Sequence, residues 1–115
     1  MSEQPDDGQK SVEQWRSEID ILDAELLRLL NQRARIASHL GALKVSSGLP
    51  VYDGRRERQV LARLCESNPG PLDRESINSI FRCIIRESRR LEISQQQAIS
   101  KSHFKQSGQE YSNGH

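Results

Sequence analysis

Apolar side chains recur at alternating steps of four and three residues from position 15 to position 43. This spacing is typical of one face of an α-helix that packs against other helices. Ser11 and Gln14 have the spacing of a capping box, and Gly48 followed by Pro50 marks a stop. We therefore expect one long helix that ends near residues 46–48. We call its periodic positions the seam: Trp15, Ile19, Leu22, Leu26, Leu29, Arg33, Ile36, Leu40 and Leu43.

Two further helical patterns follow this break. Asp53 can cap a second helix that runs to Arg63 or Leu64, before the strong stop at 68–71. Asp73 can cap a third helix that reaches about Gln97. Strand alternation and internal repeats are absent from the sequence. The pattern predicts an all-α fold with one long helix, one short helix and a third long helix.

Helices of such unequal length do not cover the whole seam within one chain. We expect an intertwined homodimeric helical bundle in which the long helices of two chains pack together. Residues 1–10 and 99–115 are polar and poor in apolar side chains, so we expect both ends to be disordered. The predicted helical domain is therefore 11–98.

Composition narrows the class of partner. The chain has 115 residues with 29% charged residues, yet its net charge is +1, which does not favour nucleic acid. Its N-terminus lacks the pattern of a secretory signal, and no apolar stretch is long enough to cross a membrane. Cys65 and Cys83 lack metal-ligand spacing, and we expect two buried thiols in a reducing compartment. We expect a cytoplasmic protein with no metal, nucleic-acid or membrane partner.

Arg33 is the one charged position on the seam. Its guanidinium stays protonated and is costly to bury without a partner. It is either a structural ion pair that sets the helix register or part of a cavity that holds an anion. Lys44 follows eleven residues later and points the same way, with its Cα roughly 16 Å from that of Arg33. The two cations could bracket a small dianion, although Lys44 could also simply favour the helix dipole.

Arg16 lies roughly 25 Å from Arg33 along the helix axis. It cannot easily reach the same ligand within one chain, but Arg16 of an antiparallel partner subunit could. The alternative is a surface ion pair with Asp20, four residues later.

Ser88 interrupts the apolar face of the third helix, and Glu92 follows one turn later on the same face. Ser88 could instead bond back to the preceding turn, and Glu92 could pair with Arg89. The charged run 55–58 could be a solvated face. These readings stay open on the residues alone.

Three segments together resemble the all-α chorismate mutase family: WRSEIDILDAELLRLLNQRARIASHLGALK, LPVYDGRRERQVL and IFRCIIRESRRLE. The resemblance covers about residues 12–97. It implies the conversion of chorismate to prephenate by an intramolecular [3,3] rearrangement, with no cofactor and no covalent intermediate. The residues that match the family's functional positions are Arg16, Arg33, Lys44, Asp53, Arg56, Glu57, Ser88 and Glu92.

The resemblance also implies a role for each matching residue. Arg33 and Arg16 of the partner subunit would hold the two carboxylates of the substrate. Lys44 would stabilise the charge that develops on the ether oxygen. Glu57, with Asp53 beside it, would accept a hydrogen bond from the ring hydroxyl. Arg56 and Ser88 would complete the ring-carboxylate side of the pocket. Glu92 would be the second donor to the ether oxygen.

Glu92 departs from the common family pattern, which has Gln at this place. A carboxyl group donates a hydrogen bond only when it is protonated. We therefore expect the activity to depend on pH.

Two other functions remain as alternatives. An isochorismate-pyruvate lyase shares the fold and the carboxylate clamps, but the segment 53–57 resembles the mutases more closely. A non-catalytic helical dimerisation module would make Arg33 a register residue.

Overall fold

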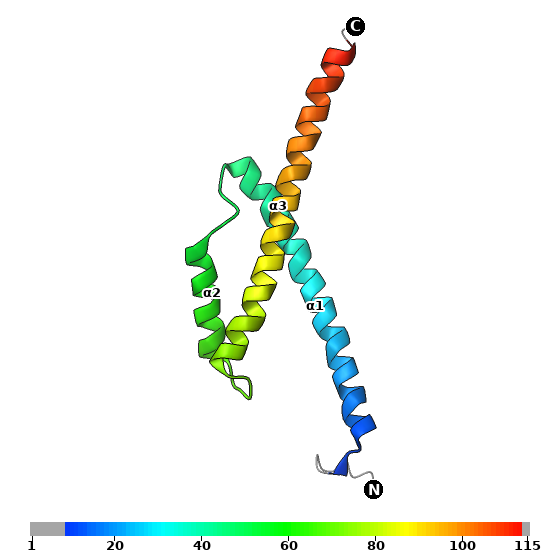
Figure 1. The fold of residues 1–115 in the computed structure, drawn as a ribbon, viewed down its shortest axis with the longest axis vertical. Coiled ribbons are helices and arrows are strands. Elements are labelled where there is room, and N and C mark those ends of the chain that lie inside the picture. The colour runs from blue at the N-terminus through cyan, green and yellow to red at the C-terminus, as the bar shows by residue number, and fades with distance from the viewer. Residues whose placement is uncertain (1–8, 114–115) are drawn as a thin grey trace. The chain divides into compact units, whose positions relative to one another are not determined.

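The computed structural model describes residues 9–113, with side chains described to Lys101. It contains three helices: α1 (Val12–Ser47), α2 (Gly54–Ser67) and α3 (Arg74–Asn113) (Figure 1). The part of the chain that the structure describes contains no strand. The predicted all-α fold of one long, one short and a third long helix is confirmed. No described helix is both long enough and apolar enough to cross a membrane.

Side chains cap the first two helices as the sequence predicts. Ser11 Oγ accepts the backbone N–H of Gln14 at 3.1 Å, and Gln14 Oε1 accepts the backbone N–H of Ser11 at 2.7 Å. This reciprocal pair is the predicted capping box. Asp53 Oδ1 accepts the backbone N–H of Arg56 at 3.1 Å and caps α2.

The C-terminal end of α1 is fixed by Gly48. Its φ of 69° is a left-handed conformation that glycine adopts without steric cost. The Leu49 N–H donates to the carbonyl of Lys44 at 2.8 Å, and the Gly48 N–H donates to that of Val45 at 3.2 Å. These two bonds form a Schellman motif. It sets the direction in which the loop 48–53 leaves the helix.

Two predicted helix ends differ from the structure. α2 continues to Ser67 rather than to Arg63 or Leu64, because nothing before the stop at 68–71 breaks a helix. α3 begins after its cap Asp73 and continues to Asn113 rather than to about Gln97, so its last part lies in the predicted polar tail, 99–115. That segment has few apolar residues but no proline, and missing apolar residues remove packing without stopping a helix. Residues 1–8 and 114–115 of the predicted disordered ends lie outside the described residues.

The chain divides into two compact units, Met1–Arg33 and Ala34–His115, and α1 contributes to both. In the second unit α2 packs against α3 (Figure 1). The C-terminal part of α1 crosses α3 at Gly41, where an added Cβ would lie 2.8 Å from the Cα of Glu92. Ala37, one turn before Gly41, is buried as well. These two small residues allow the two helix backbones to approach closely.

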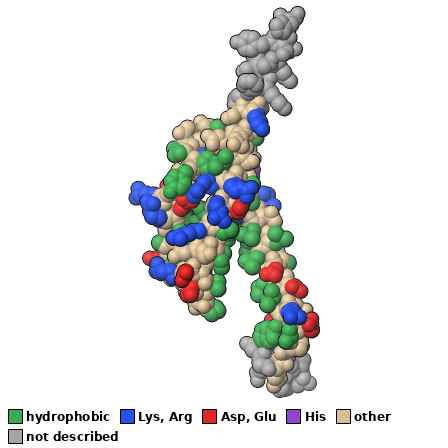
Figure 2. Space-filling view, in the orientation of Figure 1, with side chains coloured by type: hydrophobic (Ala, Val, Ile, Leu, Met, Phe, Trp, Pro, Cys, Tyr) green, Lys and Arg blue, Asp and Glu red, His purple; other side chains and the backbone are tan. Residues whose placement is uncertain are grey.

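The seam lies largely exposed in the single chain. Trp15 is 37% exposed and Leu22 is 62% exposed, and Ile36 and Leu43 are exposed in the second unit. Hydrophobic side chains are accordingly visible on the surface along α1 (Figure 2). The apolar pattern that predicts the helix is therefore not explained by packing within one chain.

Candidate functional site

Lys44 and Glu92 form an ion pair at the crossing of α1 and α3. The Lys44 Nζ lies 3.1 Å from Glu92 Oε2 and 3.3 Å from Oε1. It also donates to the backbone carbonyl of Val51 at 3.0 Å. Glu92 is only 6% exposed, and a buried carboxylate is stable only when charged or polar groups compensate it. The pair brings together the two predicted donors to the ether oxygen.

The helix crossing explains why these two side chains meet. Lys44 lies three residues after Gly41, so both face the same side of α1. Glu92 is the residue of α3 that the backbone of Gly41 touches. Lys44 lies in the last turn of α1, where the helix dipole favours a cation. It also contacts Glu92 and the Val51 carbonyl, and the dipole alone does not account for these specific contacts.

A second ion pair joins α2 to α3. The Arg89 Nη2 donates to Glu57 Oε1, and both side chains are half-buried. The Arg89 guanidinium also lies over the ring of Tyr52, with its central carbon 4.8 Å from the ring centroid. The alternative in which Arg89 pairs with Glu92 is therefore wrong, because Arg89 pairs with Glu57 and Glu92 pairs with Lys44.

Sequence reasoning did not identify Arg89 as the ion-pair partner of Glu57, or Tyr52 as the residue whose ring lies against Arg89. Glu57 and Arg89 are 32 residues apart, so no local spacing connects them. The loop residues Val51 and Tyr52 contact one ion pair each, through the Val51 carbonyl and the Tyr52 ring. Loop 48–53 thus contacts both polar clusters of the second unit.

A hollow of about 350 Å³ lies between α2 and α3 beside the second ion pair. Glu57 and Arg58 line it from α2, and Arg82, Arg86 and Arg89 line it from α3. Basic side chains gather over these helices in the space-filling view (Figure 2). With one carboxylate among four guanidinium groups, this hollow favours an anionic ligand.

Three further predicted site residues lie in the same unit. Asp53 and Arg56 are exposed at the start of α2, where the Asp53 side chain caps the helix. Ser88 is half-buried on α3, and its hydroxyl donates to the carbonyl of Ile84 at 3.0 Å. The predicted back-bonding of Ser88 to the preceding turn is therefore confirmed. Its role toward a ligand stays a prediction.

Arg16 and Arg33 lie in the first unit. Arg16 is exposed and pairs with Glu13 at 3.3 Å, so the alternative pairing with Asp20 is wrong. Arg33 is half-buried. Their roles as carboxylate clamps stay predictions.

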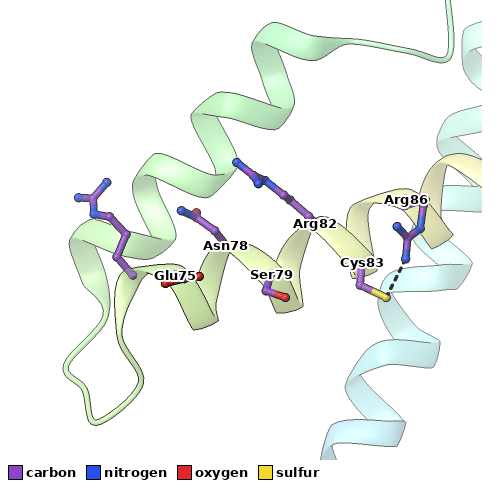
Figure 3. Close-up of a pocket in the computed structure, with 7 residues that line it drawn as sticks. Glu75, Asn78, Ser79, Arg82, Cys83 and Arg86 are labelled. Atoms are coloured by element: carbon purple, nitrogen blue, oxygen red, sulfur yellow. Dashed lines mark hydrogen bonds between the residues drawn. The ribbon is translucent and has the colours of Figure 1, made fainter.

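A second hollow, of about 830 Å³, lies along the first turns of α3 (Figure 3). None of its lining residues is a predicted site residue. Cys83 is exposed there and accepts a hydrogen bond from Arg86 Nη2 at 3.4 Å, whereas Cys65 is half-buried and donates to Asn78 Oδ1 at 3.4 Å. The prediction that both thiols are buried is wrong, because Cys83 points away from α2 (Figure 3).

Comparison with known proteins extends the likeness over most of the chain. Residues 15–93 match the family described as chorismate mutase type II. The bifunctional chorismate mutase/prephenate dehydratase of Neisseria gonorrhoeae is 46% identical over 72 residues, which cover 63% of this chain and 19% of that protein. The bifunctional protein of Aquifex aeolicus is 35% identical over 80 residues, which cover 66% of this chain and 22% of that protein. The chain thus spans about a fifth of the length of these relatives.

Solved structures match the fold as well. Chorismate mutase (form II) from Thermus thermophilus is 40% identical with a TM-score of 0.71, and the match covers 72% of this chain and 94% of that chain. Chorismate mutase from Helicobacter pylori in complex with prephenate is 30% identical with a TM-score of 0.69, over 75% of this chain and 93% of that chain. Since the family match spans residues 15–93, this chain belongs to the type II chorismate mutase family.

Proposed function

We propose that this chain is an isomerase that converts chorismate to prephenate. The observation that carries the proposal is the buried ion pair of Lys44 and Glu92 at the helix crossing, in a chain of the type II chorismate mutase family. The substrate is a small dianion with an ether oxygen and a ring hydroxyl. Arginine side chains of both units supply cations for the substrate carboxylates, Lys44 supplies one for the ether oxygen, and Glu57 supplies a carboxylate for the ring hydroxyl.

The proposed mechanism uses conformational clamping and electrostatics. Holding the substrate in its compact reactive conformer supplies a large part of the rate gain. The substrate carboxylates are held by Arg33, Arg56 and Arg16 of the partner subunit, because guanidinium groups bind carboxylates in a bidentate way. The hydroxyl group of Ser88 completes the ring-carboxylate side. Breaking the C–O bond places negative charge on the ether oxygen.

Lys44 stabilises that developing charge. Its ammonium group has three N–H donors and lies close to both Glu92 oxygens and to the Val51 carbonyl. These contacts fix the ammonium before the substrate arrives, which is the preorganisation that electrostatic catalysis requires. Glu92 supplies the second donor when it is protonated, and Glu57 accepts the ring hydroxyl with Asp53 beside it.

We further propose a homodimer with active sites shared between chains. The exposed seam residues support it, because a continuous apolar face on a single chain is typical of an interface. A two-fold arrangement of the long helices would cover this face and would bring Arg16 of one subunit to the site of the other. Sedimentation equilibrium tests the mass directly, and a monomer at assay concentration would contradict the shared site.

The cytoplasm is the proposed compartment. Cys65 and Cys83 are free, and free thiols persist where the environment is reducing. Fractionation of cells that express the tagged protein tests this assignment.

The activity is tested with purified protein by the loss of chorismate absorbance and by detection of prephenate. Lys44→Met should reduce kcat/KM by about 10²-fold, the cost typical of one missing electrostatic group in the transition state. Lys10→Met is the matched control, because Lys10 pairs with Glu18 near the start of α1 and belongs to no predicted site. Equal rates for both variants would contradict the proposed role of Lys44.

Two further measurements separate the alternative functions. Incubation with isochorismate yields salicylate and pyruvate if the chain is a lyase. A bicyclic dianionic analogue of the transition state should raise the melting temperature of a mutase. Absence of both turnover and a thermal shift would favour a non-catalytic dimerisation module.

A further inference from the structure

Glu57 is held by a residue for which the family pattern gave no role. The Arg89 Nη2 donates to Glu57 Oε1, and the two side chains come from different helices of the second unit. We propose that Arg89 is a positioning residue that orients the Glu57 carboxylate toward the ring hydroxyl of the substrate, and that Tyr52 holds Arg89 in turn. This inference rests on the proposed function and names the determinant of hydroxyl recognition within it.

The contact leaves Glu57 able to act. An ionised carboxylate has two oxygens with about four acceptor sites, and Arg89 contacts Oε1. Oε2 retains its capacity to accept the proton of a hydroxyl group. A charge-assisted contact to a planar guanidinium also restricts the rotation of the carboxylate, which lowers the entropy lost when the substrate binds.

Arg89 also offsets the negative charge of Glu57. The proposed substrate carries two negative charges, so an isolated Glu57 carboxylate would repel it. The guanidinium of Arg89 offsets that charge at the point of contact. A carboxylate can then select for the hydroxyl without weakening the binding of the dianion.

Tyr52 fixes Arg89 from the loop side. The guanidinium carbon lies 4.8 Å from the centroid of the Tyr52 ring, a stacking arrangement that arginine favours. Gly54 leaves room for this ring, because a Cβ at that position would lie 2.7 Å from the Tyr52 hydroxyl oxygen. The loop itself is held by the Schellman motif at Gly48 and by the bond from Lys44 to Val51.

The decisive measurement compares chorismate with an analogue whose ring hydroxyl is replaced by hydrogen. The ratio of the two kcat/KM values reports recognition of the hydroxyl and is insensitive to a general loss of structure. Arg89→Met should lower kcat/KM for both substrates, because the charge of Glu57 is no longer offset. It should lower kcat/KM for chorismate about tenfold more than for the analogue, the typical effect of one charge-assisted hydrogen bond. Arg90→Met is the matched control, because Arg90 is the exposed neighbour that pairs with Glu87 at 2.6 Å.

A double-mutant cycle tests whether Arg89 acts through Glu57. Glu57→Gln alone should reduce the ratio as Arg89→Met does. In the Glu57→Gln background, Arg89→Met should change kcat/KM by less than about twofold, because the interaction that it disrupts is already altered. Independent, multiplicative effects would overturn the proposal.

The possible failures are distinguishable. A wild-type protein without activity on chorismate contradicts the proposed function. An active wild type whose Arg89→Met variant loses activity equally on both substrates contradicts the positioning role alone. If Arg89→Met does not fold, Arg89→Lys answers the same question: it keeps the charge but loses the planar stack, and an unchanged ratio would overturn the role of the stacked guanidinium.

Discussion

The backbone of Gly41 in α1 touches that of Glu92 in α3. A Cβ added to Gly41 would lie 2.8 Å from the Cα of Glu92 and 3.0 Å from its carbonyl oxygen. Both neighbouring atoms belong to the backbone and cannot rotate away. The side chain of Glu92 reaches Lys44 from this crossing. The distance between the two helices therefore determines the geometry of the proposed catalytic pair.

Gly41→Ala should lower both stability and activity. Helix propensity alone would stabilise the variant by about 1 kcal/mol, whereas overpacking at a tight contact costs about 1–3 kcal/mol. We expect the second effect to prevail because α3 must move to accept the methyl group. Displacement of Glu92 from Lys44 should also reduce kcat.

Thermal melting and steady-state kinetics measure the two effects of Gly41→Ala. Ser17→Ala is the control, because Ser17 is exposed on the same helix and reports propensity without a crossing. A Gly41→Ala protein that melts higher and keeps its full kcat would show that the crossing tolerates a side chain.

Arg33→Ala should abolish activity and leave a folded dimer. Arg33 is the charged position of the seam and the proposed clamp for one substrate carboxylate. Circular dichroism and sedimentation establish the fold, and the chorismate assay establishes the loss. Arg35→Ala is the control, an exposed arginine two residues further along α1. Unfolding of the Arg33 variant would favour the structural role that the sequence leaves open.

Mixing two inactive variants should restore activity if the sites are shared. In a heterodimer of Arg16→Ala and Arg33→Ala subunits, one site contains both lesions and the other contains neither. Random re-pairing of two-fold dimers should return about a quarter of the wild-type activity. Subunit exchange is verified with differently tagged chains. Complete exchange without recovery would place both arginines in the site of one chain.

Asp73 makes part of the stability of α3 depend on pH. Hydrogen bonds from Ser76 lower the pKa of Asp73 below its ordinary value. A lowered pKa in the folded state means that this contribution is present above the unfolded pKa and is lost as pH falls through the folded pKa. Asp73→Asn keeps an acceptor without the charge.

The melting temperature of the wild type should therefore exceed that of Asp73→Asn near neutral pH, and the difference should shrink in acid, below about pH 4. Melting curves between mildly alkaline and acidic pH measure the difference. Asp20→Asn, an exposed change on α1, controls for general charge effects. A difference that stays constant over this range would contradict the prediction.

Local chemistry explains which features the sequence predicts well. The caps at Ser11, Asp53 and Asp73 and the stop at Gly48 depend on residues within one or two turns, and all four are confirmed. The C-terminal end of α3 was missed because a polar helix lacks both an apolar face and a breaker.

Contacts between distant segments were harder to predict. In the sequence, Gly41 is only a residue of low helix propensity. The structure shows that a side chain at this position would collide with the backbone of Glu92. Arg89 has a plausible partner one turn away in Glu92, yet it contacts Glu57 across 32 residues. Such choices depend on how α2 and α3 pack, which the spacing of residues within one helix does not specify.

Glu92 should make the proposed rearrangement faster as the pH falls from neutral. An ionised Glu92 would repel the negative charge that forms on the ether oxygen, and only the protonated acid can donate a hydrogen bond to it. The structure adds that Lys44 contacts both Glu92 oxygens and also the Val51 carbonyl. Protonation of Glu92 therefore removes the competing negative charge beside the ammonium, while the Val51 carbonyl still holds the ammonium in place. Both effects act in the same direction on kcat.

Glu92→Gln provides a permanent donor of nearly the same shape. It should flatten the pH profile of kcat and keep or raise the activity at neutral pH. Glu92→Ala should be slow at every pH, by about 10²-fold for one missing transition-state donor. The rise of the wild-type rate should end where the fold fails. A flat wild-type profile, with the Gln variant no faster than the Ala variant, would remove Glu92 from the mechanism and leave Lys44 as the donor to the ether oxygen.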